Sequence, residues 1–87
     1  MITEEELKQI ELRCASAQRG PWKAFIEGRD HESGSNFIMT GEGNQRGDDI
    51  EMLGATEADY NFIANARQDI PRLVQEVRQL KAGKGLQ

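Results

Sequence analysis

Residues 56–82 read TEADYNFIANARQDIPRLVQEVRQLKA and carry the strongest pattern in the chain. Apolar residues recur there at alternating steps of three and four, which is the spacing of one face of an amphipathic helix. The series, called the stripe below, comprises Ile63, Ala66, Ile70, Leu73, Val77 and Leu80. An a/d series of this kind also forms helix–helix seams, so the stripe is either core alone or core together with an oligomer seam. The second alternative makes these six residues the partner-binding set of a homo-oligomer.

The ends and the interior of this helix also carry sequence signals. Thr56 provides a cap at its start, and the helical pattern stops near residue 82. Pro71 lies inside the pattern, where it removes a backbone N–H. Because the stripe keeps its phase across Pro71, we expect a kinked helix or two helices joined by a tight turn. Residues 1–82 are then expected to form one domain, and residues 83–87 a flexible tail.

The rest of the chain reads as one helix followed by short strands. A capping box at Thr3 opens the first helix, which ends at Gly20-Pro21. The strand candidates are residues 22–27, 36–40 and 50–53, and seven of the nine glycines fall in residues 20–54. This pattern predicts an α+β protein of order α-β-β-β-α, with both helices on one face of a three-stranded antiparallel meander.

Composition restricts the compartment and the partners. The net charge of the 87 residues is −4, and residues 20–55 hold seven acids and three bases. Cys14 is the only cysteine, which excludes an intramolecular disulfide and a cysteine-rich zinc site. The acidic start of the chain and the absence of a long apolar run favour a cytoplasmic protein without a membrane partner. Acids interrupt the basic residues of the second helix, so we expect no binding to duplex DNA.

The chain carries no catalytic signature. Asp30, His31 and Glu32 form the only cluster with an imidazole, and Ser33 follows it. Consecutive residues of an extended loop point alternately to opposite sides, and no second His or Cys completes a metal set. Ser33 lacks the strand-to-helix elbow of a nucleophile. We therefore expect no enzyme, no metal and no cofactor, and an enzyme built on Asp30, His31 and Ser33 is only a third hypothesis.

Trp22, the lone tryptophan, has two possible roles. It is either a buried anchor of a thin core or a half-exposed platform that stacks on a ligand. In the second case Arg29 and Arg67 would pair with anionic oxygens and His31 would donate a hydrogen bond. Trp22, Arg29, His31 and Arg67 are therefore the candidate ligand-binding residues.

Several segments also resemble a known group of sequences. They are Gly20-Pro21-Trp22 after the first helix, Gly28-Arg29-Asp30-His31, Phe37-Ile38-Met39-Thr40-Gly41 and the block ADYNFIANARQDIPRL of residues 58–73. Together they resemble a family of small bacterial, prophage and phage proteins over nearly the whole chain. The resemblance implies a self-contained intracellular protein and a mobile-element context, and it supplies no catalytic residue.

Two functional hypotheses follow. The first is a non-enzymatic homo-oligomeric binding protein that captures a small anionic, nucleotide-like ligand or a partner protein. The second is an acidic inhibitor or immunity-type protein, whose acidic middle third covers a basic site on a partner protein.

Overall fold

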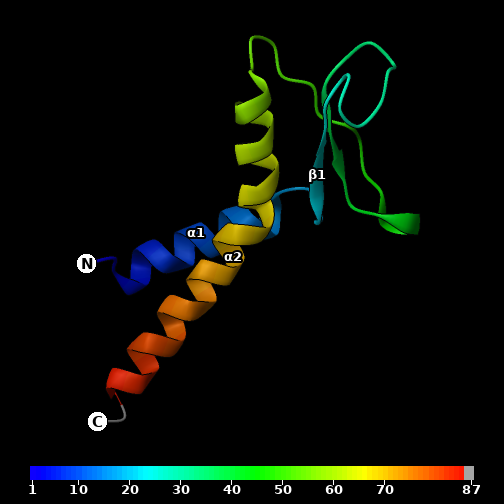
Figure 1. Ribbon diagram of the computed structural model, residues 1–87. Helices are drawn as coiled ribbons and strands as arrows, with labels where there is room; N and C mark the ends of the chain where they lie inside the picture. Colours follow the sequence, from blue (N-terminus) through cyan, green and yellow to red (C-terminus); the bar gives the residue numbers. More distant parts are fainter. Residues whose placement is uncertain (86–87) are drawn as a thin grey trace.

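The computed structural model describes residues 1–85 and has the α+β class that the sequence predicts. Its elements are α1 (Glu4–Ser16), β1 (Trp22–Phe25), β2 (Phe37–Thr40), the short 3-10 helix η1 (Gly43–Gln45) and α2 (Glu57–Gly85). Helix α2 is the axis of the molecule, with the two strands beside its first half (Figure 1). Helix α1 packs against its second half.

Helix α1 begins at the predicted capping box. The Thr3 hydroxyl accepts a hydrogen bond from the Glu6 N–H at 3.1 Å, and the Glu6 carboxylate accepts one from the Thr3 N–H at 2.9 Å. Leu7 is buried in the contact between α1 and α2. The helix packs against α2 rather than against the strands, so the expectation that both helices cover one face of the sheet is wrong.

The sheet has two antiparallel strands in the part of the chain that the structure describes, with Trp22 opposite Thr40 and Phe25 opposite Phe37. The third predicted strand is reduced to one bridge between Ile38 and Ile50. Beyond that bridge the Met52 N–H donates to the Tyr60 hydroxyl at 2.8 Å, which takes the donor that a strand ladder would use. The three-stranded meander and the α-β-β-β-α order are therefore not confirmed.

Strand β1 also ends two residues earlier than predicted. The Ile26 N–H donates to the Asp30 carboxylate, and the Glu27 N–H donates to the Asn36 side-chain oxygen. Side chains of the following loop thus satisfy the backbone donors that would otherwise extend the strand.

Helix α2 is one continuous helix that contains Pro71, as the kinked alternative requires. At its start the Thr56 hydroxyl accepts from the Asp59 N–H, and the Asp59 carboxylate accepts from the Thr56 N–H. Figure 1 shows the helix bending near its middle, close to the proline, where the backbone hydrogen bond to Arg67 is lost. The helix continues to Gly85, so part of the expected tail is helical, and residues 86–87 of that tail lie outside the described residues.

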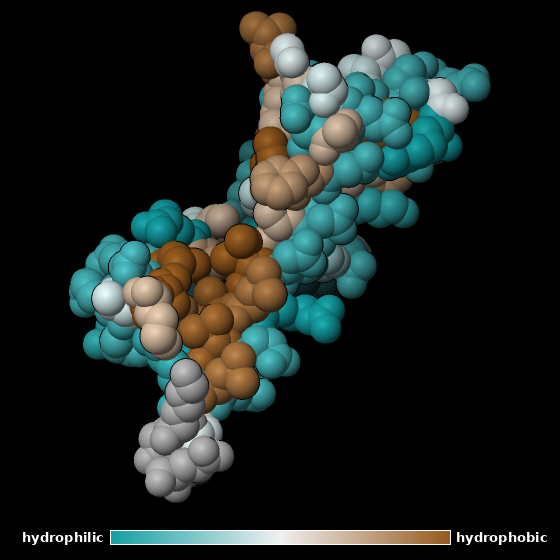
Figure 2. Space-filling view, turned by 60° about the vertical axis from the view of Figure 1, so that its left-hand side comes forward, coloured by the Kyte–Doolittle hydropathy of each residue, from teal (hydrophilic) through white to brown (hydrophobic). Residues whose placement is uncertain are grey.

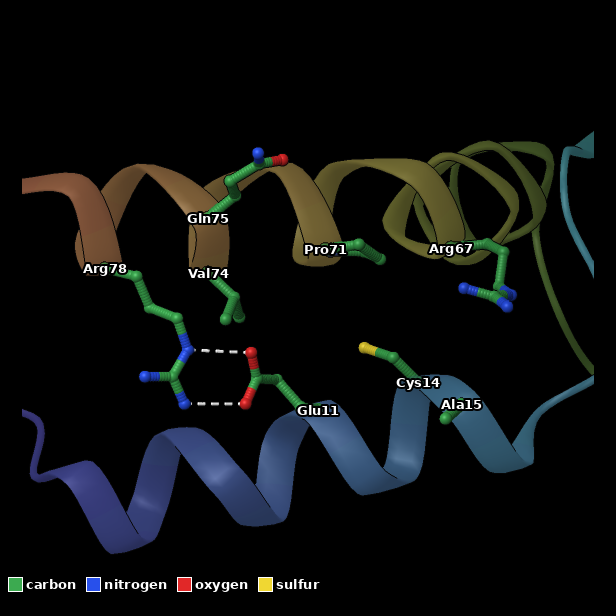
Figure 3. Close-up of a pocket in the computed structure, with 8 residues that line it drawn as sticks. All are labelled: Glu11, Cys14, Ala15, Arg67, Pro71, Val74, Gln75 and Arg78. Carbon is green, nitrogen blue, oxygen red and sulfur yellow. Dashed lines mark hydrogen bonds and ion pairs between the residues drawn. The ribbon is translucent and has the colours of Figure 1, made fainter.

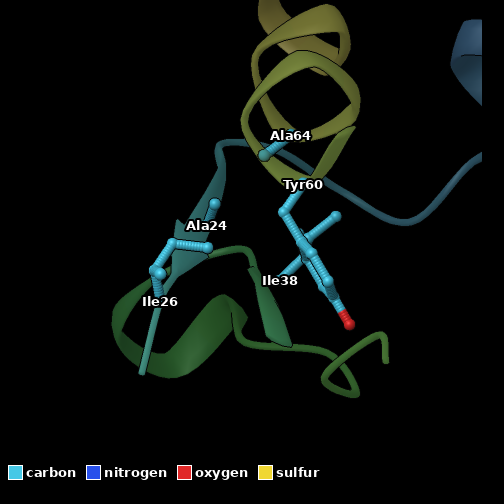
Figure 4. Close-up of a cluster of buried hydrophobic side chains, with 5 residues drawn as sticks. All are labelled: Ala24, Ile26, Ile38, Tyr60 and Ala64. Atoms are coloured by element: carbon cyan, nitrogen blue, oxygen red, sulfur yellow. The ribbon is translucent and has the colours of Figure 1, made fainter. Parts of the chain in front are cut away.

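The buried core lies on a face of α2 that the stripe does not occupy. Ala24 and Ile26, with Ile38 of β2, pack against Tyr60 and Ala64 of α2 (Figure 4). Because Ala64 is small, the helix backbone approaches the strands closely. The core is therefore formed by residues next to the stripe, and the stripe is left for another contact.

Candidate interaction surface

Four of the six stripe residues on α2 are exposed, and Ala66 and Val77 are half-buried. Exposed fractions are 36% for Ile63, 40% for Ile70, 60% for Leu73 and 66% for Leu80. Apolar side chains gather over the second half of α2 and the adjoining side of α1 (Figure 2). We call this surface the apolar face and define it as the six stripe residues together with Ile10 and Cys14 of α1 and its C-cap residue Ala17. Monomers rarely expose apolar residues in such a contiguous group, so the face is a candidate contact surface.

A groove runs along this face between α1 and α2, and we call it the α1–α2 groove. Its volume is about 430 Å³. Ile10 and Ala17 form one wall, Ile63 and Ile70 form the other, and Trp22 also lines the groove. Arg13 and Arg67 also line the groove, and the Arg67 Nε donates to the Gln18 carbonyl. An apolar floor with a basic rim suits an apolar occupant that carries negative charge beside its apolar side chains.

Trp22 and Arg67 meet at the same backbone oxygen. The Trp22 indole N–H donates to the Gln18 carbonyl at 3.1 Å, and the Arg67 Nε donates to it at 2.9 Å. The Gln68 side chain holds β1 to α2, since it accepts from the Trp22 N–H at 2.7 Å and donates to the Trp22 carbonyl at 3.1 Å. Trp22 is half-buried, so it both anchors the strand and presents part of its ring to the groove.

Arg29 is engaged in contacts within the chain. Its guanidinium pairs with Asp30 at 2.8 Å and with Glu57 at 3.3 Å, which ties the loop after β1 to the start of α2. The hydrogen bond to Asp30 raises the pKa of Arg29, and the same bond lowers the pKa of Asp30. The Arg29 N–H groups, which were predicted to bind an anionic ligand, thus donate to carboxylates of the same chain.

His31 lies on the same loop as Arg29, beyond the end of β1. Its Nδ1 lies 2.6 Å from the Ser33 hydroxyl and 3.5 Å from the Glu27 carboxylate. A catalytic triad needs the acid and the nucleophile on opposite ring nitrogens, whereas here both contact Nδ1. The Nε2 atom is buried and finds no partner within residues 1–85. The ring packs against Phe25 and Phe37, whose own rings stack on each other, so its surroundings are those of a structural side chain.

The four candidate ligand residues therefore fall into two pairs. Trp22 and Arg67 lie together at the groove, whereas Arg29 and His31 lie on the loop that follows the other end of β1. Sequence reasoning missed Arg13 as a groove residue, although it precedes Cys14 of the apolar series on α1.

Arg78 fixes α1 to the second half of α2. Its guanidinium forms two parallel bonds with Glu11, at 2.8 Å from Nε and 2.6 Å from Nη2, as Figure 3 shows. It also contacts Glu4 at 2.9 Å. The hydrogen bonds from Arg78 lower the pKa of Glu11, and those from Glu11 and Glu4 raise the pKa of Arg78. This clamp sets the relative position of the two helices that form the groove.

Two acids of the middle third form ion pairs within the chain, Asp30 with Arg29 and Asp49 with Arg46, so the negative charge of this region is partly neutralised. Over residues 1–85 no group of three His, Cys, Asp or Glu side chains could hold a metal ion. Neither helix, as far as the described chain extends, has the length and apolarity needed to cross a membrane.

Comparison of the chain with protein-family models, with curated proteins and with solved structures finds no significant match. The resemblance to small bacterial, prophage and phage proteins therefore stays a prediction.

Proposed function

We propose that this chain is a non-enzymatic binding protein that works as a homo-oligomer and uses the apolar face as its contact surface. One observation carries the proposal: the stripe keeps helical spacing over 18 residues, from Ile63 to Leu80, yet the core lies beside it. Regular apolar spacing on an exposed helix face is the pattern by which helices recognise other helices.

The exposed area of the stripe can be compared with the cost of association. Fully burying a large aliphatic side chain stabilises by about 1.5–3 kcal/mol. The exposed fractions of the four large stripe residues, taken over two copies, equal about four such side chains and give roughly 6–12 kcal/mol. Association costs about 4–15 kcal/mol, so the two quantities are of the same order. The contacts of α1 add to the favourable side.

The geometry favours a protein partner over a nucleotide-like ligand. A nucleotide site would need Trp22, Arg29, His31 and Arg67 around one cavity, but the four residues form two separate pairs. The α1–α2 groove instead offers an elongated apolar surface bordered by arginines. That combination fits an amphipathic helix with acidic residues beside its apolar side chains.

Light scattering over a range of protein concentrations tests the proposal. We expect wild-type protein to exceed the monomer mass and Leu73→Glu to be a monomer, because the new charge would be buried in the contact. Leu53→Glu is the matched control, since Leu53 is fully exposed on the loop before α2 and lies outside the apolar face. A wild-type monomer at every concentration, or equal effects of the two variants, would overturn the proposal.

A further inference from the structure

A second cavity lies along the contact between α1 and α2, and we call it the clamp pocket because the Arg78 clamp forms one of its ends (Figure 3). Its volume is about 450 Å³, which is within the range of about 300–1,000 Å³ that small-molecule sites occupy. On α1 it is lined by Glu11 and Ala15, which do not line the α1–α2 groove. Of the described residues that line the pocket, only Cys14 and Arg67 also line the groove. The two cavities therefore lie on opposite sides of the helix contact.

The middle of the clamp pocket is apolar. Pro71 and Val74 face it from α2, and the Cys14 thiol points into it from α1 (Figure 3). Val74 is buried and Pro71 is half-buried, so the packing of the helices holds both in place. A thiol in such surroundings behaves as a small apolar group. The middle of the pocket therefore suits the apolar part of a ligand and disfavours a charged group.

Arg67 places unused hydrogen-bond donors at the other end of the clamp pocket. Its Nε donates to the Gln18 carbonyl at 2.9 Å, which fixes the guanidinium, and the side chain points from α2 toward α1 (Figure 3). Its two terminal nitrogens form no hydrogen bond or ion pair within residues 1–85. Two N–H donors in one plane match the two oxygens of a carboxylate. Arg67 is thus an anion-binding group that is positioned before a ligand arrives.

The Arg78 end of the pocket is already satisfied. Each of the three guanidinium nitrogens of Arg78 donates to Glu11 or Glu4, and both Glu11 oxygens accept from Arg78. A ligand is therefore oriented with its anionic group at Arg67 and its apolar part toward Val74. These two positions are seven residues apart on α2, or about 10 Å at the rise of a helix, so the apolar part is a tail of several carbon atoms.

We propose that the clamp pocket binds a small monocarboxylate with a slim apolar tail, such as a medium-chain fatty acid, whose carboxylate pairs with Arg67 and whose tail packs against Pro71 and Val74. This site goes beyond the proposed function, because it lies within one chain and needs no second copy. It also differs from the nucleotide site that the sequence suggested, since Arg29 and His31 do not line it.

An NMR titration of ¹⁵N-labelled protein with octanoate tests the site. We expect saturable amide shift changes over residues 11–15 and 72–78. The neutral counterpart 1-octanol is expected to bind roughly tenfold or more weakly, because it has no carboxylate to pair with the guanidinium. Leu73→Glu is expected to bind octanoate as the wild type does, since Leu73 does not line the pocket. The proposal is wrong if 1-octanol binds as tightly, if Leu73→Glu abolishes binding, or if the shift changes centre on Ile63 and Ile70 of the groove.

Two pairs of variants test the contacts. Arg67→Ala is expected to raise the octanoate dissociation constant roughly tenfold or more. Arg72→Ala is its control, since it removes the same charge at an exposed residue of α2 that does not line the pocket. Ala15→Trp fills the pocket from an exposed position and is expected to abolish binding, and Ala58→Trp at the exposed start of α2 is its control. Equal effects within either pair would overturn the proposal. If circular dichroism shows Arg67→Ala to be unfolded, the Ala15→Trp pair alone decides.

Discussion

The position of the core can be tested by comparing Ile38→Ala with Leu73→Ala. Ile38 is completely buried, where β2 faces Tyr60, and it forms the bridge to Ile50. Leu73 belongs to the regular stripe but is 60% exposed. A sequence reading that treats the stripe as core alone predicts a large loss of stability for Leu73→Ala, whereas the structure predicts the larger loss for Ile38→Ala.

The magnitudes follow from burial. The change Ile38→Ala removes three carbon atoms and leaves a cavity, which costs about 2–5 kcal/mol. A domain of this size has a total stability of roughly 4–13 kcal/mol, so this loss is a large fraction of it. The change Leu73→Ala removes a side chain that is less than half-buried in the monomer, which costs about 1 kcal/mol or less.

Urea denaturation followed by circular dichroism measures both free energies of unfolding. The protein is kept at a concentration at which light scattering gives the monomer mass, because a dimer would add the contribution of Leu73 at the seam. We expect Ile38→Ala to shift the midpoint strongly and Leu73→Ala only slightly. If the monomer loses as much stability from Leu73→Ala as from Ile38→Ala, the stripe is core and the apolar face is not available for binding.

Three further predictions concern the clamp, the core and the groove. Because Arg78 lowers the pKa of Glu11, the ionised Glu11 stabilises the fold fully above its usual pKa of 4.5. This stabilisation is lost as the pH falls through the lowered pKa. The difference in thermal midpoint between wild type and Glu11→Gln is therefore expected to shrink below about pH 5. Tyr60→Phe removes the acceptor of the Met52 N–H and is expected to cost about 1–3 kcal/mol in denaturant unfolding, with faster amide hydrogen exchange at Met52. The Trp22 emission maximum is expected to move to shorter wavelength as the protein concentration rises, because association covers the groove that Trp22 lines. Leu73→Glu is expected to abolish this shift.

Local signals in the sequence predicted where the helices begin, whereas α1 ends at Ser16, before the predicted end at Gly20-Pro21. The caps at Thr3 and Thr56 place both helix starts correctly, because a capping hydrogen bond depends on residues only three positions apart. The same locality explains the error at residues 50–53. Whether that segment continues as a strand depends on the Tyr60 hydroxyl, which takes the Met52 N–H from another element, and alternation of residue types carries no information about such a competitor.

The sequence predicted only part of the candidate site, and the missing part again depends on contacts between elements that are distant in the chain. The stripe itself follows from spacing, but spacing does not determine which face of a long helix the strands will cover. Here the strands cover the face with Tyr60 and Ala64, since a small residue permits close approach and a tyrosine fills the space beside it. The bend near Pro71 then allows the second half of α2 to pack against α1 through the Arg78 clamp.

The two halves of α2 have different packing partners, and this difference accounts for the exposed apolar face. The first half has the strands as its packing partner, and the second half packs against α1, which covers one flank. Among residues 1–85 no other element covers the remaining flank of the second half. In the proposed homo-oligomer a second copy would supply an apolar surface of the same spacing. The regular spacing of the stripe would then allow it to pack against the second copy. The stripe is exposed in the single chain because it would be covered by that copy.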